Sequence, residues 1–119
     1  MGAPRAKSLK DLERFEEAKS LIRKTAPVAR RVLGVSHITT LRLRWMYALT
    51  LYADPSATLN DLREAVAMHE ETERTARRVL GGTHPVTTGI EGNLREVRAA
   101  LRASKVLQTS NELGAQLEI

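Results

Sequence analysis

Several residue types are absent from this sequence or rare in it. Cysteine is absent, which excludes disulfide bonds and thiolate metal sites. The aromatic side chains are Phe15, Trp45, Tyr47 and Tyr52 alone. No run reaches the roughly 18 consecutive apolar residues of a membrane-spanning helix, and the polar N-terminus lacks the apolar stretch of a secretory signal. We therefore expect a cytoplasmic protein that does not enter a membrane.

Motifs of catalysis are missing as well. The chain has no cysteine nucleophile, no glycine-rich phosphate loop, and no serine, histidine and acid arranged in a recognisable motif. We therefore predict a protein that is not an enzyme and that needs no cofactor.

The charge pattern is mixed. The 19 basic residues exceed the 14 acidic ones and give a formal net charge of +5, but both signs are interspersed along the same segments. Such mixing is typical of a solvated helical surface. Because the basic residues are not interleaved with aromatic ones, nucleic acid is an improbable partner, and RNA binding stays the least favoured alternative.

One segment of the chain occurs twice. Residues 29–40 read ARRVLGVSHITT and residues 76–87 read ARRVLGGTHPVT, so eight of twelve positions are identical at a separation of 47 residues. A repeat of this length is typical of stacked solenoids, in which each unit buries its apolar face against its neighbours. A binding surface is therefore a better expectation than a catalytic pocket.

Apolar residues spaced at intervals near three and four predict about four helices. The first should run from Ser8, a suitable N-cap, to Leu33, and Gly34 should end it. Pro27 lies inside this segment, so we expect a kink or a short break near Thr25.

The second helix should begin near His37 and end at Asp54-Pro55. Thr58 and Asp61 have the spacing of a capping arrangement for the third helix, and Gly81 should end that helix.

The fourth helix should start near His84, with Pro85 in its first turn. Its polar outer face suits the end of an array. From Thr109 to Ile119 no period is evident, so a frayed or strand-like end is expected there, or else docking of Leu113, Leu117 and Ile119 on a partner. The predicted division is an N-terminal extension over 1–8, a helical repeat domain over 9–108 and a tail over 109–119.

These spacings resemble the tetratricopeptide repeat, in the form found in kinesin light chain and related proteins. Ala18 precedes Gly34 by sixteen residues, Ala65 precedes Gly81 by sixteen, and a histidine follows each glycine by three. The resemblance covers roughly residues 9–102. The chain departs from the family at Ile38, where proline is usual, and in its repeat of 47 residues, which places extra length between the second and third helices.

The resemblance implies an all-α superhelix of antiparallel helix pairs whose concave wall is built by the second and fourth helices. It also implies a scaffold or adapter that binds a peptide or helical segment of a protein partner. The family's contact positions fall on Arg42, Trp45, Met46, Leu49, Tyr52, Gly89, Gly92, Asn93 and Glu96.

Two of these sets have alternative explanations. Trp45, Leu49 and Tyr52 share one helical face and either line a groove or fill the core. Gly89 and Gly92 either admit another backbone or mark a weak helix start, since glycine costs a helix roughly 1 kcal/mol relative to alanine.

The three histidines do not suggest a metal site. His37 and His84 occupy equivalent turns of the repeat, where packing and hydrogen bonding across the turn are expected, and zinc needs three or four convergent ligands. His69 lies on the apolar stripe of the third helix and is expected at its boundary.

The leading function is therefore a protein or peptide-binding module with Trp45, Leu49 and Tyr52 as apolar anchors and Arg42 facing an acidic group. The main alternative is a structural module that self-associates, in which a homodimer completes the stack.

Overall fold

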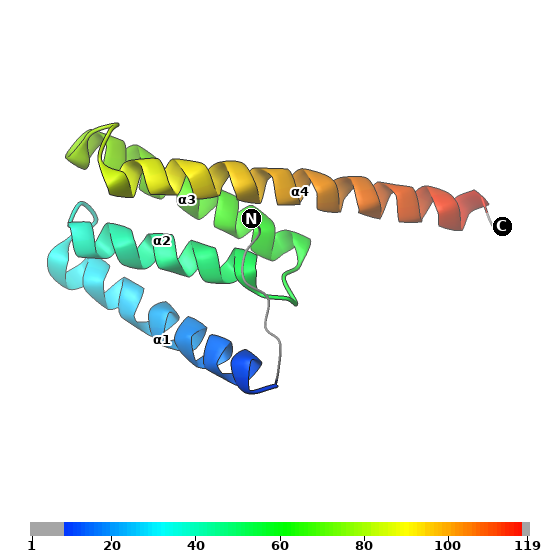
Figure 1. The fold of residues 1–119 in the computed structure, drawn as a ribbon, viewed down its shortest axis with the longest axis horizontal. Coiled ribbons are helices and arrows are strands. Elements are labelled where there is room, and N and C mark those ends of the chain that lie inside the picture. The colour runs from blue at the N-terminus through cyan, green and yellow to red at the C-terminus, as the bar shows by residue number, and fades with distance from the viewer. Residues whose placement is uncertain (1–8, 118–119) are drawn as a thin grey trace.

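The computed structural model describes residues 9–117 and contains four α-helices joined by short turns (Figure 1). The helices are α1 (Leu9–Leu33), α2 (Ile38–Ala53), α3 (Leu59–Leu80) and α4 (Pro85–Leu117). Each helix packs on the next along the chain, and α2 also packs on α4. The described residues form no strand, and the predicted all-α helical repeat is confirmed.

The two copies of the repeated segment form the same turn. Gly34 has φ +93° and Gly81 has φ +94°, a region that favours glycine. The N–H of each glycine donates to a carbonyl four residues earlier, at 3.0 Å for Gly34 and 3.1 Å for Gly81. The sequence repeat is therefore a repeat of backbone geometry, and both glycines end their helices as predicted.

α1 continues through Pro27. Proline removes one hydrogen bond from the helix, but Pro27 is exposed, so the carbonyl it leaves unpaired lies on the solvent side. The short break that was one alternative near Thr25 is therefore wrong, and the kink stays a prediction. The predicted N-cap, Ser8, lies outside the described residues.

The turn from α2 to α3 spans residues 54–58, only one residue more than each of the two repeated turns. Most of the extra length expected between these helices is therefore helical. Thr58 accepts a hydrogen bond from the Asp61 N–H, and the Asp61 carboxylate accepts one from the Thr58 N–H. This reciprocal capping box starts α3 as the sequence predicted.

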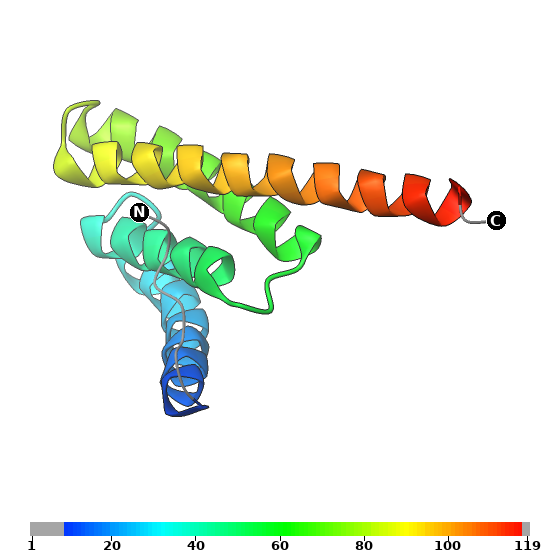
Figure 2. The same ribbon diagram turned by 45° about the vertical axis from the view of Figure 1, so that its right-hand side comes forward.

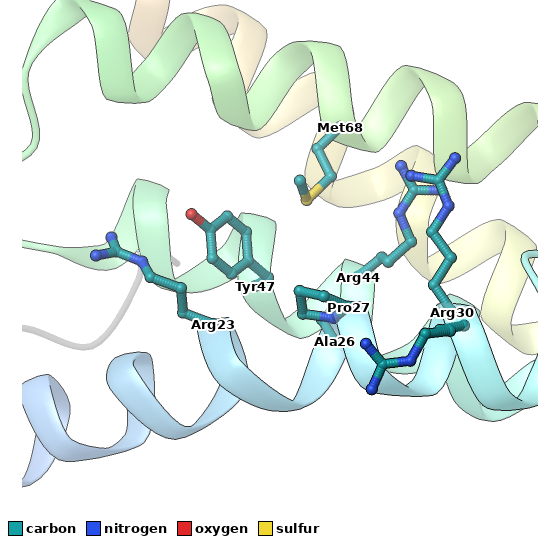
Figure 3. Close-up of a pocket in the computed structure, with 8 residues that line it drawn as sticks. Arg23, Ala26, Pro27, Arg30, Arg44, Tyr47 and Met68 are labelled. Carbon is teal, nitrogen blue, oxygen red and sulfur yellow. The ribbon is translucent and has the colours of Figure 1, made fainter.

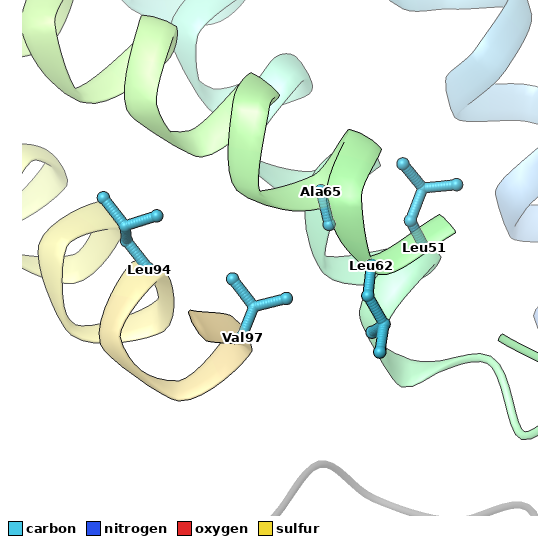
Figure 4. Packing of buried hydrophobic residues seen from close by; sticks show 5 residues of the cluster. All are labelled: Leu51, Leu62, Ala65, Leu94 and Val97. Atoms are coloured by element: carbon cyan, nitrogen blue, oxygen red, sulfur yellow. The ribbon is translucent and has the colours of Figure 1, made fainter. Parts of the chain in front are cut away.

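The core lies where α2, α3 and α4 meet. One buried cluster joins Leu51 of α2, Leu62 and Ala65 of α3, and Leu94 and Val97 of α4 (Figure 4). A second cluster nearer the repeated turns is formed by Leu41, Ala76, Val86 and Ile90. The small alanines Ala65 and Ala76 allow the helix axes to approach one another.

α1 packs on α2 through Ile22, Ala26 and Ala29, all of which are buried. The Thr40 hydroxyl donates to the Ala29 carbonyl at 3.3 Å. At the other end of the pair, Lys19 Nζ donates to Asp54 Oδ2 at 2.9 Å. Polar contacts therefore fix both ends of this helix pair.

α4 extends past the ends of the other helices in both views (Figure 1, Figure 2). The helix continues to Leu117, so the frayed or strand-like end expected from Thr109 is wrong over 109–117. Residues 118–119 lie outside the described part. Across residues 9–117, every helix is too short or too polar to cross a lipid bilayer.

Candidate functional site

The residues proposed to contact a partner lie on α2 and α4, and they differ in exposure. Arg42, Met46 and Glu96 are exposed. The other six are partly buried: Trp45, Leu49, Tyr52, Gly89, Gly92 and Asn93.

Trp45 connects the two helices. Its ring packs against the cluster around Leu41 and Ile90, and its Nε1 donates to Asn93 Oδ1 at 2.8 Å. The Asn93 amide nitrogen also lies 3.5 Å from Glu96 Oε2. Trp45 therefore contributes to packing between α2 and α4 and presents only part of its surface to solvent.

Gly89 gives the Trp45 ring its space. A β-carbon at Gly89 would lie 2.5 Å from Cη2 and 2.7 Å from Cζ2 of the indole. At Gly92 the nearest atom to such a carbon would be Arg95 Nη2 at 3.9 Å. Of the two glycines in α4, Gly89 is thus required for a close approach inside the chain, and Gly92 is not.

Tyr52 packs against the cluster of Leu51 and Leu62. Arg42, Met46 and Leu49 instead follow one another at spacings of four and three, which puts them on one stripe of α2. We call the inner face the predicted contact residues outside the contacts of Trp45 and Tyr52, namely this stripe together with Gly92 and Glu96 of α4.

The equivalent histidines cap helices. Nδ1 of His37 accepts from the Thr39 N–H, and Nδ1 of His84 accepts from the Val86 N–H, both at 3.1 Å. Each therefore satisfies a free N–H at the start of the following helix. The described residues hold no cluster of three or more histidine and carboxylate side chains that is suited to a metal ion.

The place of His69 on the apolar stripe suggested a boundary residue, and that prediction is wrong. Its side chain is fully buried, and neither ring nitrogen has a hydrogen-bond partner among the described residues. Desolvation lowers the pKa of His69 to about 4, so the ring is neutral at physiological pH. The helical period placed His69 on the apolar stripe correctly, but its depth depends on how α2 and α4 pack over α3.

A cavity of about 580 Å³ lies between α1 and α3 above α2 (Figure 3). Its apolar lining comes from Ala26 and Pro27 of α1, Tyr47 of α2 and Met68 of α3. Its other lining residues are the arginines Arg23, Arg30, Arg31 and Arg44. We call this cavity the arginine cleft; it contains none of the residues predicted to contact a partner.

Arg44 is the buried member of that set. Its side chain is 8% exposed, and Nη2 lies 3.0 Å from Glu71 Oε2 on α3. Nη1 is buried and has no hydrogen-bond partner among the described residues. Arg23, Arg30 and Arg31 are exposed and form no ion pair with the residues that the structure describes. The cleft therefore carries an excess of positive charge.

This cleft was not predicted from the sequence, although the sequence contains a signal for it. Arg23 and Arg30 lie seven residues apart on α1, about two helical turns, which puts them on one face, and Arg31 directly follows. Arg44 gave no signal, because an arginine on a helix is usually solvated.

A second cavity of about 300 Å³, lined by side chains of α3 and α4, differs in charge. Arg77 pairs with Glu73 and Glu91, and Arg98 lies 3.7 Å from Glu70. Because three glutamates line this cavity beside its four arginines, it carries no comparable excess of charge.

The comparisons with known proteins give one family. The model of the tetratricopeptide repeat matches residues 6–39 and 57–86, which together make up more than half of the chain. Neither the curated proteins nor the solved structures that were searched give a match. Each matched segment ends just after a glycine turn and its capping histidine, the part of the fold that the chain repeats. The chain belongs to the tetratricopeptide repeat family.

Proposed function

We propose that this protein is a cytoplasmic scaffold or adapter that binds a peptide or a helical segment of another protein on its inner face. Tetratricopeptide repeats generally mediate protein–protein interaction and are typically non-enzymatic. The spacing of Ala18 to Gly34 and of Ala65 to Gly81 supports a likeness to the kinesin light chain form.

The observation that carries this proposal is the stripe on α2. Met46 is 46% exposed and lies between Arg42 and Leu49 on the stripe. Methionine adapts its shape to irregular apolar partners, and arginine pairs with carboxylates. A partner segment would bury Met46 and Leu49 and place an acidic group at Arg42. Trp45, Tyr52, Gly89 and Asn93 would hold α2 and α4 in place beneath it.

The test is a substitution that alters the inner face without altering the core. Met46→Glu puts a charge at an exposed position, and Glu is a good helix former. Val79→Glu on α3 is the matched control, because Val79 is 44% exposed and is not part of the inner face. We expect a partner captured from cell extract by wild type and by Val79→Glu to be lost with Met46→Glu. Equal capture by all three proteins would contradict the proposal.

A self-associating module is the second candidate, and exposed apolar side chains support it. Val32 on α1 is 70% exposed and Leu107 on the projecting part of α4 is 65% exposed. α1 and α3 each precede a glycine turn, so α1 of a second copy placed against α4 would continue the alternation of helices. Such a contact would bury the exposed apolar side chains of α1 and α4, and this burial would favour association.

The molar mass in solution decides this point. Light scattering over a range of concentrations should give a dimer or a larger assembly for wild type and a monomer for Leu107→Lys. A monomer at all concentrations would exclude the self-association proposal and leave the inner-face proposal unaffected.

A further inference from the structure

The arginine cleft lies apart from the inner face. It is lined by α1, α2 and α3, and it shares no residue with the stripe of Arg42, Met46 and Leu49. α1 and α3 both pack on α2 and not on each other, which leaves the space between them open above Tyr47. A volume of about 580 Å³ is in the range of ligand sites in proteins.

Charge is what distinguishes this cleft from an ordinary gap between helices. Arg23, Arg30 and Arg31 have no ion pair among the described residues, and Glu71 neutralises only part of Arg44. Keeping several guanidinium groups close together is unfavourable without anions, particularly where one of them is removed from water. A ligand that carries carboxylates would remove this repulsion.

The buried end of Arg44 points to the same chemistry. Nη1 has no acceptor, and an unsatisfied buried donor on a charged group costs roughly 1–3 kcal/mol or more. A core arginine of this kind is usually fully paired. Nη1 itself is enclosed by the protein, so a carboxylate in the cleft would offset the charge of Arg44 that Glu71 only partly neutralises, without bonding to Nη1 directly.

The layout of the cleft indicates the shape of its ligand. Figure 3 shows Arg23 toward one end, Tyr47, Pro27 and Met68 in the middle, and Arg30 and Arg44 toward the other end. A single small anion would engage one end and leave the apolar middle empty. An extended segment with an apolar side chain between acidic ones fits both ends and the middle.

We propose that the arginine cleft between α1 and α3 is a second binding site, which takes an acidic peptide segment of a partner protein. Its apolar side chain packs on Tyr47 and Met68, and its carboxylates pair with Arg23 and Arg31 and reach Arg44. This site is independent of the inner face.

The test uses a panel of short fluorescent peptides, each with one apolar residue between acidic residues, and their counterparts with Gln in place of every acid. Binding is measured by fluorescence anisotropy to the full chain. The double variant Arg23→Gln, Arg31→Gln removes two charges from the cleft. Arg78→Gln, Arg102→Gln is the matched control, since both arginines are exposed outside the cleft and Arg78 occupies the repeat position equivalent to Arg31.

We expect acidic peptides to bind and their Gln counterparts not to bind. The cleft variant should weaken binding about tenfold or more, because two charge-assisted hydrogen bonds are lost, and the control variant should not. Met46→Glu should leave this binding unchanged, which separates it from the inner-face function. Circular dichroism verifies that each variant is folded.

Three results would overturn the proposal. The first is that no acidic peptide binds better than its Gln counterpart. The second is an equal loss of binding in the cleft and control variants, which would mean general charge attraction. The third is that the cleft prefers a different ligand. Full displacement of the peptide by inorganic phosphate would show this, and so would tighter binding of an oligouridine RNA that the cleft variant abolishes.

Discussion

The indole of Trp45 lies so close to the backbone of Gly89 that a β-carbon there would be 2.5 Å from the ring. This contact joins α2 to α4, and the hydrogen bond from Trp45 to Asn93 fixes the orientation of the ring. The relative position of the two helices that carry the inner face therefore depends on the absence of a side chain at one residue.

Replacing that glycine should destabilise the protein although alanine is the better helix former. Gly89→Ala would force the indole or α4 to move, and overpacking of this kind costs about 1–3 kcal/mol. Chemical denaturation followed by Trp45 fluorescence measures the loss. Gly92→Ala is the control, because space is available there, and it should stabilise by up to about 1 kcal/mol. Similar effects of both substitutions would contradict the packing described for Trp45.

Burial of His69 should make the protein less stable in mild acid. Its pKa is lowered from 6.5 to about 4 by desolvation, so between these values the unfolded chain binds a proton that the folded chain does not. Acidification therefore favours unfolding, by about 2 kcal/mol between pH 7 and pH 5. Urea denaturation across this range measures the dependence.

His69→Leu is the matched variant, since it removes the titrating group and the two unpaired nitrogens. It should flatten the dependence of the unfolding free energy on pH and retain or raise stability at pH 7. An unchanged slope in this variant would show that another group is responsible.

The ion pair of Lys19 and Asp54 should stabilise the packing of α1 on α2. The hydrogen bond to Asp54 raises the pKa of Lys19. Burial alone would raise the pKa of Asp54, but hydrogen bonds from Lys19 and the Ser56 N–H outweigh it, and the net pKa is lowered. Lys19→Met should cost about 1–3 kcal/mol by leaving a largely buried carboxylate without its partner.

The pH dependence of this pair has a defined sign. Because the pKa of Asp54 in the folded protein is below its usual value of 3.8, its contribution is present above that pH and is lost as the pH falls further. For Lys19 the contribution is present below 10.5 and is lost as the pH rises above the raised value. Lys19→Arg, which keeps the charge, should retain most of the stability; a loss equal to that of Lys19→Met would argue against the ion pair.

The capping box at the start of α3 should be worth about 1 kcal/mol. Thr58→Ala removes the acceptor for the Asp61 N–H, and Thr58→Ser keeps it. Thermal denaturation of the two variants should show a lower midpoint for alanine alone. If serine is as destabilising as alanine, the methyl group of Thr58 and not its hydroxyl matters.

Local signals explain why much of the fold was predictable from the sequence. Gly34, Gly81 and Thr58 act on the residues beside them, and each ends or starts its helix as predicted. Pro27 was misleading because a proline on an exposed face leaves its unpaired carbonyl where water can reach it. Residues 109–117 were misleading because the sequence shows no clear period there, yet the helix continues.

The candidate sites were less predictable, because they depend on contacts between helices. The spacing placed Arg42, Met46 and Leu49 on one stripe, and their role in binding stays a prediction. Whether Trp45 lined a groove or filled the core was open on the sequence, and the structure shows it partly buried between α2 and α4.

By itself, the sequence determined the repeat, the ends of most helices and the membership of a helical repeat family, because each depends on residues within a turn or two of one another. Only the tertiary structure decided that His69 is buried, that Gly89 admits the Trp45 ring, and that Arg44 faces a cleft with three further arginines. These features depend on how helices distant in the chain are placed against one another, and the period of a single helix does not contain that information.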